Sequence, residues 1–278
     1  MDIFEKIKNQ YSSLSESKQL IAKYFMDEWM EVAFSTTREI AKKLNVSEAL
    51  IIRFSADLGY SGFKELQNEL RNLMRTKLGR TDRIKNFKGD NTDEYARRVF
   101  QVETQNLAHT FEANSEESIE KAVTLLIQAR NIYTVGDRNA AAVALLACIH
   151  FNEALGNALP LMGMYGTSMD YLRNADEQDC LLAVSLPDYS RYTVDMVKVA
   201  KSKGIRIISI TDSLFSDLAP FSDVVLLVAC DSLTFNFSHV GSIALINTLI
   251  THIAAREKEE SVKNVSEIEG ITSDRLEF

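Results

Sequence analysis

The sequence predicts two domains of different class: an N-terminal all-α helix-turn-helix domain, then a C-terminal α/β domain whose parallel five-stranded sheet is flanked by helices. The length of 278 residues accommodates two domains. Helical apolar spacing fills roughly the first 80 residues, whereas short apolar runs alternate with helical segments farther along the chain. An apolar fraction of 46% with only 3 prolines indicates a well-packed, helix-rich protein.

Residues 36–64 carry the helix-turn-helix pattern. The apolar positions expected to pack between its helices are Ile40, Ala41, Leu44, Ile51, Ile52 and Phe54. Asn45 tolerates left-handed backbone angles in the turn, and Ser47 is suited to cap the second helix. Because the second helix of such a unit enters the major groove, we expect this domain to bind double-stranded DNA.

Changes in composition predict the domain boundaries. We expect a helix-turn-helix domain at 1–78, a polar linker at 79–93, an α/β domain at 94–256 and a charged, loosely held tail at 257–278. Within the first domain, Ser15 is suited to begin a helix that runs to about Val32, and a further helix covers residues 64–77.

Five short apolar runs predict the strands of the second domain. They are residues 132–135, 159–162, 181–185, 205–210 and 224–228. Helical spacing predicts helices at 95–113, 118–129, 140–155, 193–203 and 240–256. Apolar strands separated by such helices form parallel sheets, which bind ligands at the carboxyl ends of their strands near the topological switch point.

The charge distribution agrees with DNA binding by the first domain only. The net charge is −8, but residues 1–80 hold 13 Lys and Arg against 11 Asp and Glu, a balance of +2, which leaves −10 for the remainder. A local positive face matters more for binding phosphates than the net charge does. Three cysteines without metal-ligand spacing, no apolar run of about 18 residues and no signal peptide predict a cytoplasmic protein without a membrane segment.

The motifs of the first domain resemble the RpiR (MurR/RpiR) family of bacterial transcriptional regulators. The matching segments are 32–34, 40–41, 46–49, 53–54, 58–60 and 62–66. The second domain resembles the family's SIS (sugar isomerase) domain, a phosphosugar-sensing α/β module, in segments 132–136, 179–185, 200–212, 218–219 and 222–227. The resemblance covers most of residues 1–256, in the family's domain order.

The resemblance implies a set of DNA-binding residues. These are Thr36, Arg38, Lys42, Ser47, Glu48, Arg53 and Lys64. Arg53 is the strongest candidate, since a guanidinium bridges guanine or holds a phosphate. Glu48 either faces the groove or is a favourable charge at a helix N-terminus. The other charged positions either contact phosphates or are solvated surface charges, and Leu50 replaces a position that is small and polar in the family.

The resemblance also implies an effector site in the loops after the first and third strands. The candidate residues are Gly136, Arg138, Asn139, Ser185, Ser190, Arg191, Thr193 and His239. These loops depart from the family pattern, because arginines stand where serine and glycine are expected. Either the arginines replace backbone amides as anion ligands, or the site is repurposed and Thr193 caps the next helix.

The leading hypothesis is a DNA-binding regulator whose SIS domain senses a small anionic, phosphosugar-like metabolite. It is expected to bind a palindromic site as a homo-oligomer, a dimer or tetramer, with residues 95–107 and 240–253 as candidate contact surfaces. The alternatives are a sugar-phosphate isomerase using Glu153 or His239 as its base, and a ligand-independent DNA-binding scaffold. We expect no catalytic residues, cofactor or metal site, because the four histidines stand apart in the sequence.

Overall fold

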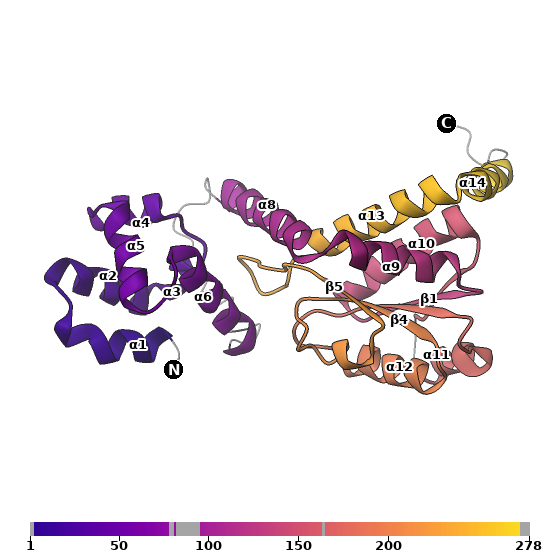
Figure 1. The fold of residues 1–278 in the computed structure, drawn as a ribbon, viewed down its shortest axis with the longest axis horizontal. Coiled ribbons are helices and arrows are strands. Elements are labelled where there is room, and N and C mark those ends of the chain that lie inside the picture. The colour runs from indigo at the N-terminus through magenta and orange to yellow at the C-terminus, as the bar shows by residue number, and fades with distance from the viewer. Residues whose placement is uncertain (1–2, 78–80, 82–94, 163–164, 273–278) are drawn as a thin grey trace. The chain divides into compact units, whose positions relative to one another are not determined.

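A computed structural model describes residues 3–77, 81, 95–162 and 165–272 (Figure 1). The chain forms two compact units: residues up to 102 together with 231–236, and the rest of the chain from residue 103. Apart from Thr81, the predicted linker at 79–93 lies outside the described residues. No helix in the described part of the chain is long and apolar enough to cross a membrane.

The first unit is helical, as predicted. Its elements are α1 (Ile3–Gln10), the short 3-10 helix η1 (Tyr11–Ser13), α2 (Glu16–Asp27), α3 (Trp29–Val32), α4 (Thr37–Leu44), α5 (Glu48–Asp57) and α6 (Phe63–Lys77). Phe54 of α5 packs edge-on against Phe25 of α2, with ring centroids 5.3 Å apart, and both rings are buried. The helix predicted from Ser15 to Val32 is instead two helices, separated at Glu28.

One predicted core position of the first unit is wrong. Ile51 and Phe54 are fully buried, but the side chain of Ile52 is 47% exposed. Successive residues of a helix are turned by about 100°, so a helix that buries positions 51 and 54 presents position 52 to solvent.

The second unit contains the predicted parallel five-stranded sheet, in the order β2-β1-β3-β4-β5. The strands are β1 (Ile132–Gly136), β2 (Ala158–Pro160), β3 (Cys180–Val184), β4 (Arg206–Thr211) and β5 (Val224–Leu227). Helix α8 (Tyr95–Ala113) begins in the first unit and continues into the second from residue 103. The other helices are α9 (Glu116–Ile127), α10 (Asn139–Leu155), α11 (Tyr165–Tyr171), α12 (Arg191–Ser202), α13 (Val240–Arg256) and α14 (Lys258–Thr272), with short 3-10 turns η3 (Leu172–Asn174) and η4 (Ala219–Phe221). Helices cover both faces of the sheet.

Alternate residues of the strands face two separate cores. Cys180 and Leu182 of β3 belong to the core under α9, α10 and α13, whereas Leu181 and Ala183 belong to the core under α12 (Figure 1). This burial on both faces explains why the strands read as continuous apolar runs rather than as alternating ones.

The expected loose tail is largely a packed helix. Helix α14 lies against α10, where Ser261 is buried. The side chains of Ser261 and Asn264 donate hydrogen bonds to the carbonyl of Ala154, at 3.2 and 3.1 Å. This carbonyl is among the last four of α10, which have no partner within their own helix, so α14 satisfies a group that α10 cannot.

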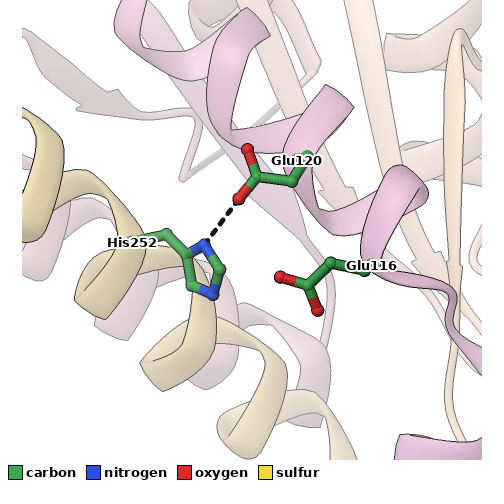
Figure 2. Close-up of side chains that lie close together, drawn as sticks. All are labelled: Glu116, Glu120 and His252. Atoms are coloured by element: carbon green, nitrogen blue, oxygen red, sulfur yellow. Dashed lines mark hydrogen bonds and ion pairs between the residues drawn. The ribbon is translucent and has the colours of Figure 1, made fainter.

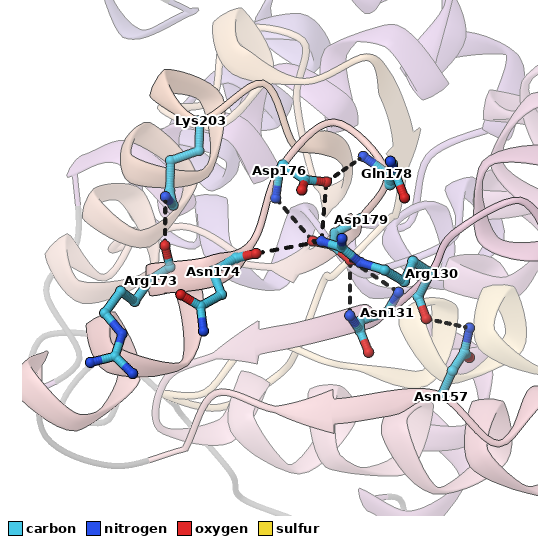
Figure 3. Close-up of polar contacts among 9 residues, drawn as sticks. All are labelled: Arg130, Asn131, Asn157, Arg173, Asn174, Asp176, Gln178, Asp179 and Lys203. Atoms are coloured by element: carbon cyan, nitrogen blue, oxygen red, sulfur yellow. Dashed lines mark hydrogen bonds and ion pairs between the residues drawn. The ribbon is translucent and has the colours of Figure 1, made fainter.

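A polar network joins the amino ends of the central strands (Figure 3). The carboxylate of Asp179, just before β3, accepts hydrogen bonds from Arg130 at 3.0 and 2.5 Å and from the backbone and side chain of Asn131 at 3.1 and 3.0 Å. Burial alone would raise the pKa of Asp179, but these hydrogen bonds, led by that from Arg130, lower it below the ordinary value. The network therefore fixes the start of β1 against the start of β3.

Candidate DNA-binding surface and effector site

The turn between α4 and α5 has the local structure that the sequence predicts. Thr36 caps α4 in a capping box: its hydroxyl accepts from the backbone N–H of Glu39 at 3.2 Å, and the Glu39 carboxylate accepts from the backbone N–H of Thr36 at 2.7 Å. Asn45 adopts the left-handed conformation, with φ of 53°, and Ser47 caps α5 by accepting from the N–H of Leu50. These caps set the angle at which α5 follows α4.

Helix α5 presents one face to solvent. The exposed positions are Glu48, Ala49, Ile52, Arg53, Ala56 and Asp57, which recur at helical spacing. Arg53 is anchored by a hydrogen bond from its Nε to the carbonyl of Ala49 at 3.2 Å. Ile52 beside it was missed as a surface residue, because an apolar side chain within an apolar run gives no sign that it faces outward.

The residues predicted to bind DNA are all exposed on the first unit. They are Thr36, Arg38, Lys42, Ser47, Glu48, Arg53 and Lys64. Three of them have local structural roles: Thr36 and Ser47 cap helices, and Glu48 accepts a hydrogen bond from the hydroxyl of Thr37 at 2.7 Å. The last contact joins the first turns of α4 and α5, which favours a structural role for Glu48.

The predicted effector loops meet at the switch point of the sheet. The chain leaves β1 toward β2 on one side and leaves β3 toward β4 on the other, while β1 and β3 are neighbours. The loops that follow them are joined by a hydrogen bond from the hydroxyl of Ser190 to Asp137 at 2.7 Å. Gly136 has a packing role, since a Cβ there would lie 2.5 Å from the carbonyl oxygen of Ala140.

The loop after β1 is held in a strained conformation. Arg138 has φ of 52° and ψ of −121°, an arrangement that costs a non-glycine residue about 1–3 kcal/mol. Its backbone N–H donates to the carboxylate of Asp137 at 2.9 Å, and its side chain is exposed. Asn139, also exposed, begins α10. Strain of this kind is concentrated at ligand sites and switches.

Ser185 and Thr193 are buried in and beside the loop after β3. Their residues are 3% and 0% exposed, and the Thr193 hydroxyl has no hydrogen-bond partner among the described residues. Thr193 does not cap α12, because that helix begins at Arg191 and Ser190 is its N-cap residue. The alternative role considered for Thr193 is therefore wrong.

The side chain of Arg191, a predicted effector residue, lies at the surface and not in a buried site. Its side chain is 91% exposed and pairs with Asp195, one helical turn later, at 3.7 Å. The same loop is held from its other side by Tyr189, whose hydroxyl donates to Asp212 after β4 at 2.7 Å. Burial, followed by the hydrogen bond to Asp212, raises the pKa of Tyr189 well above its usual value.

His239 directly precedes α13, with its Nδ1 buried and lacking a partner in the described structure. Burial lowers its pKa below the ordinary value of 6.5, so the imidazole is neutral near pH 7. Four further buried hydroxyls of the second unit lack partners among the described residues, those of Thr134, Thr211, Ser216 and Ser242. The sequence pattern missed them because isolated Ser and Thr residues beside apolar runs are common, and only their burial distinguishes them.

Two family models match the chain in the order of its two units. Residues 1–77 match the helix-turn-helix domain of the rpiR family, and residues 125–254 match the SIS domain. The sugar isomerase domain of an RpiR transcription factor from Sphaerobacter thermophilus is 31% identical, with a TM-score of 0.62, over 66% of this chain and 99% of that one. The chain belongs to the RpiR family.

Relatives match along nearly the whole length of this RpiR protein. An uncharacterized HTH-type transcriptional regulator of Thermotoga maritima is 26% identical over 266 residues, which are 92% of this chain and 93% of that protein. The Vibrio vulnificus NanR protein, solved as a complex with ManNAc-6P, shares the fold over 100% of both chains, with a TM-score of 0.60 and 18% identity. This protein is thus a transcriptional regulator with a helix-turn-helix and a SIS domain, not an enzyme.

Proposed function

We propose that this RpiR protein binds operator DNA through α5 and senses a small anionic metabolite of the phosphosugar class at the carboxyl edge of its sheet. The observation that carries the proposal is a set of buried polar groups without partners among the described residues, all at or after the carboxyl ends of β3, β4 and β5 in the chain: Thr193, Thr211, Ser216, His239 and Ser242. A buried hydroxyl without a partner costs about 1–3 kcal/mol, and ligand oxygens are partners that remove this cost.

The chemistry of the site suits a phosphosugar better than an apolar ligand. Hydroxyls and backbone N–H groups at the starts of α10 and α12 donate to phosphate oxygens, and helix N-termini favour negative charge. Arg138 is the arginine suited to contact the phosphate as well, since it lies in the strained loop after β1. Arg191 is less suited to bind the phosphate in the described conformation, because it pairs with Asp195 at the surface. The ManNAc-6P complex of the Vibrio relative makes amino-sugar phosphates the first ligands to test.

The hydrogen bond between Ser190 and Asp137 links ligand binding to a change in conformation. A phosphate that recruits the hydroxyl of Ser190 must displace the carboxylate of Asp137, which repels it. Ligand binding would then separate the two loops and move the start of α12. Such a change controls operator binding only if the ligand has different affinities for the two conformations.

An isomerase using Glu153 as its base fits the structure poorly. Helix α10 starts at the carboxyl edge and its 17 residues extend for about 25 Å, so Glu153 lies near the opposite edge. There its carboxylate contacts Nδ1 of His150 at 3.0 Å.

The effector proposal is tested by operator release and by thermal stability in the presence of defined sugars. Phosphosugars, including ManNAc-6P, are expected to raise the melting temperature and change operator binding, whereas the same sugars without phosphate do neither. Thr193→Val is expected to abolish the response. Thr251→Val is the matched control, because Thr251 is exposed on α13 and donates to the carbonyl of Asn247. An unaltered response in Thr193→Val would contradict this assignment.

For DNA recognition we propose that Arg53 and Ile52 act together on neighbouring bases. The guanidinium of Arg53 suits guanine or phosphate, and the exposed side chain of Ile52 suits the methyl group of thymine. Arg53→Ala is expected to abolish operator binding in a gel shift. Ile52→Ala should weaken binding less and remove any preference for thymine over deoxyuridine in the operator; wild-type binding by Arg53→Ala would contradict the proposal.

We further propose that the protein binds its operator as a homodimer through α8. This helix carries Phe100, Leu107 and Phe111 with exposed fractions of 75%, 41% and 82%, at spacing that places them along one stripe. Helix α13, the other candidate, exposes Ile243 at 38%. A Phe111→Ser variant is expected to shift sedimentation toward the monomer and to weaken binding to a two-half-site operator; an unchanged assembly would exclude α8 as the contact.

A further inference from the structure

Helices α9 and α13 bring together three side chains that no pattern in the sequence connects: Glu116, Glu120 and His252 (Figure 2). Glu116 and Glu120 are one turn apart on α9, and His252 projects from α13 toward both. One ligating atom from each residue lies within 4.8 Å of the other two. His252 Nδ1 and Glu120 Oε1 are 2.9 Å apart.

The backbone beneath this cluster is firmly held. Ile119 and Val123 of α9 lie between and after the two glutamates and are buried, at 8% and 0% exposed. On α13, Leu249 and Ile253 flank His252 and are fully buried in the same core. The cluster therefore needs side-chain rotation, not helix movement, to close on a ligand.

We infer that this cluster binds a divalent first-row transition metal ion, with Zn²⁺ as the reference case. Imidazole and carboxylate ligands coordinate zinc at about 2.0–2.2 Å, so ligand atoms of a single ion lie roughly 3–4 Å apart. The three ligating atoms of the cluster lie within 4.8 Å of one another, so small side-chain rotations suffice to reach this spacing. Ca²⁺ and Mg²⁺ prefer all-oxygen sites, so the imidazole selects against them.

The three side chains are exposed enough for an ion to enter the cluster and to retain water molecules as further ligands. The side chains of Glu120 and His252 are 33% and 29% exposed, and Glu116 is exposed. The other oxygen of Glu120 pairs with Arg256, which also donates to the hydroxyl of Thr124 at 3.4 Å. Arg256 orients the carboxylate, as hydrogen-bonded groups do around metal ligands, but it also competes with a cation for Glu120.

The competing interpretation is an ion-pair network that only joins the two helices. In that case Glu120, His252 and Arg256 carry the interaction and the charge of Glu116 contributes little. A metal site requires Glu116 as a ligand. The effect of Glu116 on metal binding therefore distinguishes the two interpretations.

Isothermal titration of the full-length protein with ZnCl₂, after treatment with chelator, tests the inference. We expect one ion per chain and a rise in melting temperature. Glu116→Gln and His252→Ala should each weaken binding by at least about tenfold, the lower limit for losing even an outer-shell partner. Arg256→Gln should strengthen binding by removing the competing cation. His150→Ala is the matched control, because within the described part of the chain His150 pairs with one carboxylate, that of Glu153, at 3.0 Å.

Two results would overturn the inference: no saturable zinc binding by the wild-type chain, or equal binding by wild type and Glu116→Gln. Melting of Glu116→Gln without zinc shows whether the variant is folded. The test uses neither operator nor sugar, so its outcome is independent of the proposed regulatory function.

Discussion

Buried polar groups are treated differently at the amino edge of the sheet, just before β1 and β3, and at its carboxyl edge, where β3 and β4 end. At the amino edge, every oxygen of Asp179 accepts hydrogen bonds, from Arg130, Asn131 and the backbone of Asp176. At the carboxyl edge, Thr193 and Thr211 are as deeply buried but have no partners among the described residues. A polar group that is satisfied within the protein stabilises the fold, whereas one that is left unsatisfied is available to a ligand.

The comparison suggests that the edges divide stability and sensing between them. Variants at the amino edge should lower the free energy of unfolding and leave ligand specificity alone. Variants at the carboxyl edge should change the response to ligand and alter the free energy of unfolding much less. Three measurements test this division.

The largest effect is expected from Asp179→Ala. The substitution leaves Arg130 and the N–H groups around it without their acceptor, so the free energy of unfolding should fall by about 3 kcal/mol. Urea unfolding followed by circular dichroism measures the loss. Glu260→Ala removes an exposed pair with Lys263 on α14, at 3.4 Å, and serves as the control, with an expected change of less than about 0.5 kcal/mol. Equal losses in the two variants would refute the special role of the amino edge.

A smaller effect on the free energy of unfolding is expected from the protonation of His239. Because burial lowers its pKa in the folded protein, the unfolded chain binds the proton more tightly. His239 therefore contributes stability above about pH 6.5 that is lost as the pH falls below this value. The decrease in stability between pH 7.5 and 5.5 should be smaller in His239→Gln than in the wild type. Parallel pH profiles for the two proteins would contradict the assignment.

The smallest effect on stability is expected from Thr193→Val. The substitution keeps the shape of the side chain and removes a hydroxyl that has no partner, so unfolding should change by less than about 0.5 kcal/mol, or the variant should be slightly more stable. Chemical denaturation provides the measurement. A loss of 1 kcal/mol or more would mean that the hydroxyl has a structural partner, and would weaken the argument for a ligand at this edge.

The same contrast explains why the sequence pointed to the polar residues of the amino edge but not to those of the carboxyl edge. Asp179 stands directly before an apolar strand, and this arrangement formed part of the resemblance to the SIS domain. Thr211 and Ser242 carry no comparable signal, since each is a small polar residue beside apolar ones. Ile52 was placed in the core for the same reason: within an apolar run, the sequence alone leaves open which side of the helix faces solvent.

By itself, the sequence determined the five strands and their order, most of the helices, the helix-turn-helix and the family. This information is local, because periodicity and capping residues act over a few positions. Only the tertiary structure decided which distant residues meet. The pairing of Ser190 with Asp137 depends on β1 lying beside β3. The approach of His252 to Glu120 spans 132 residues and depends on how two helices pack on one sheet. Such contacts arise from the packing of whole elements, which no short window of sequence contains.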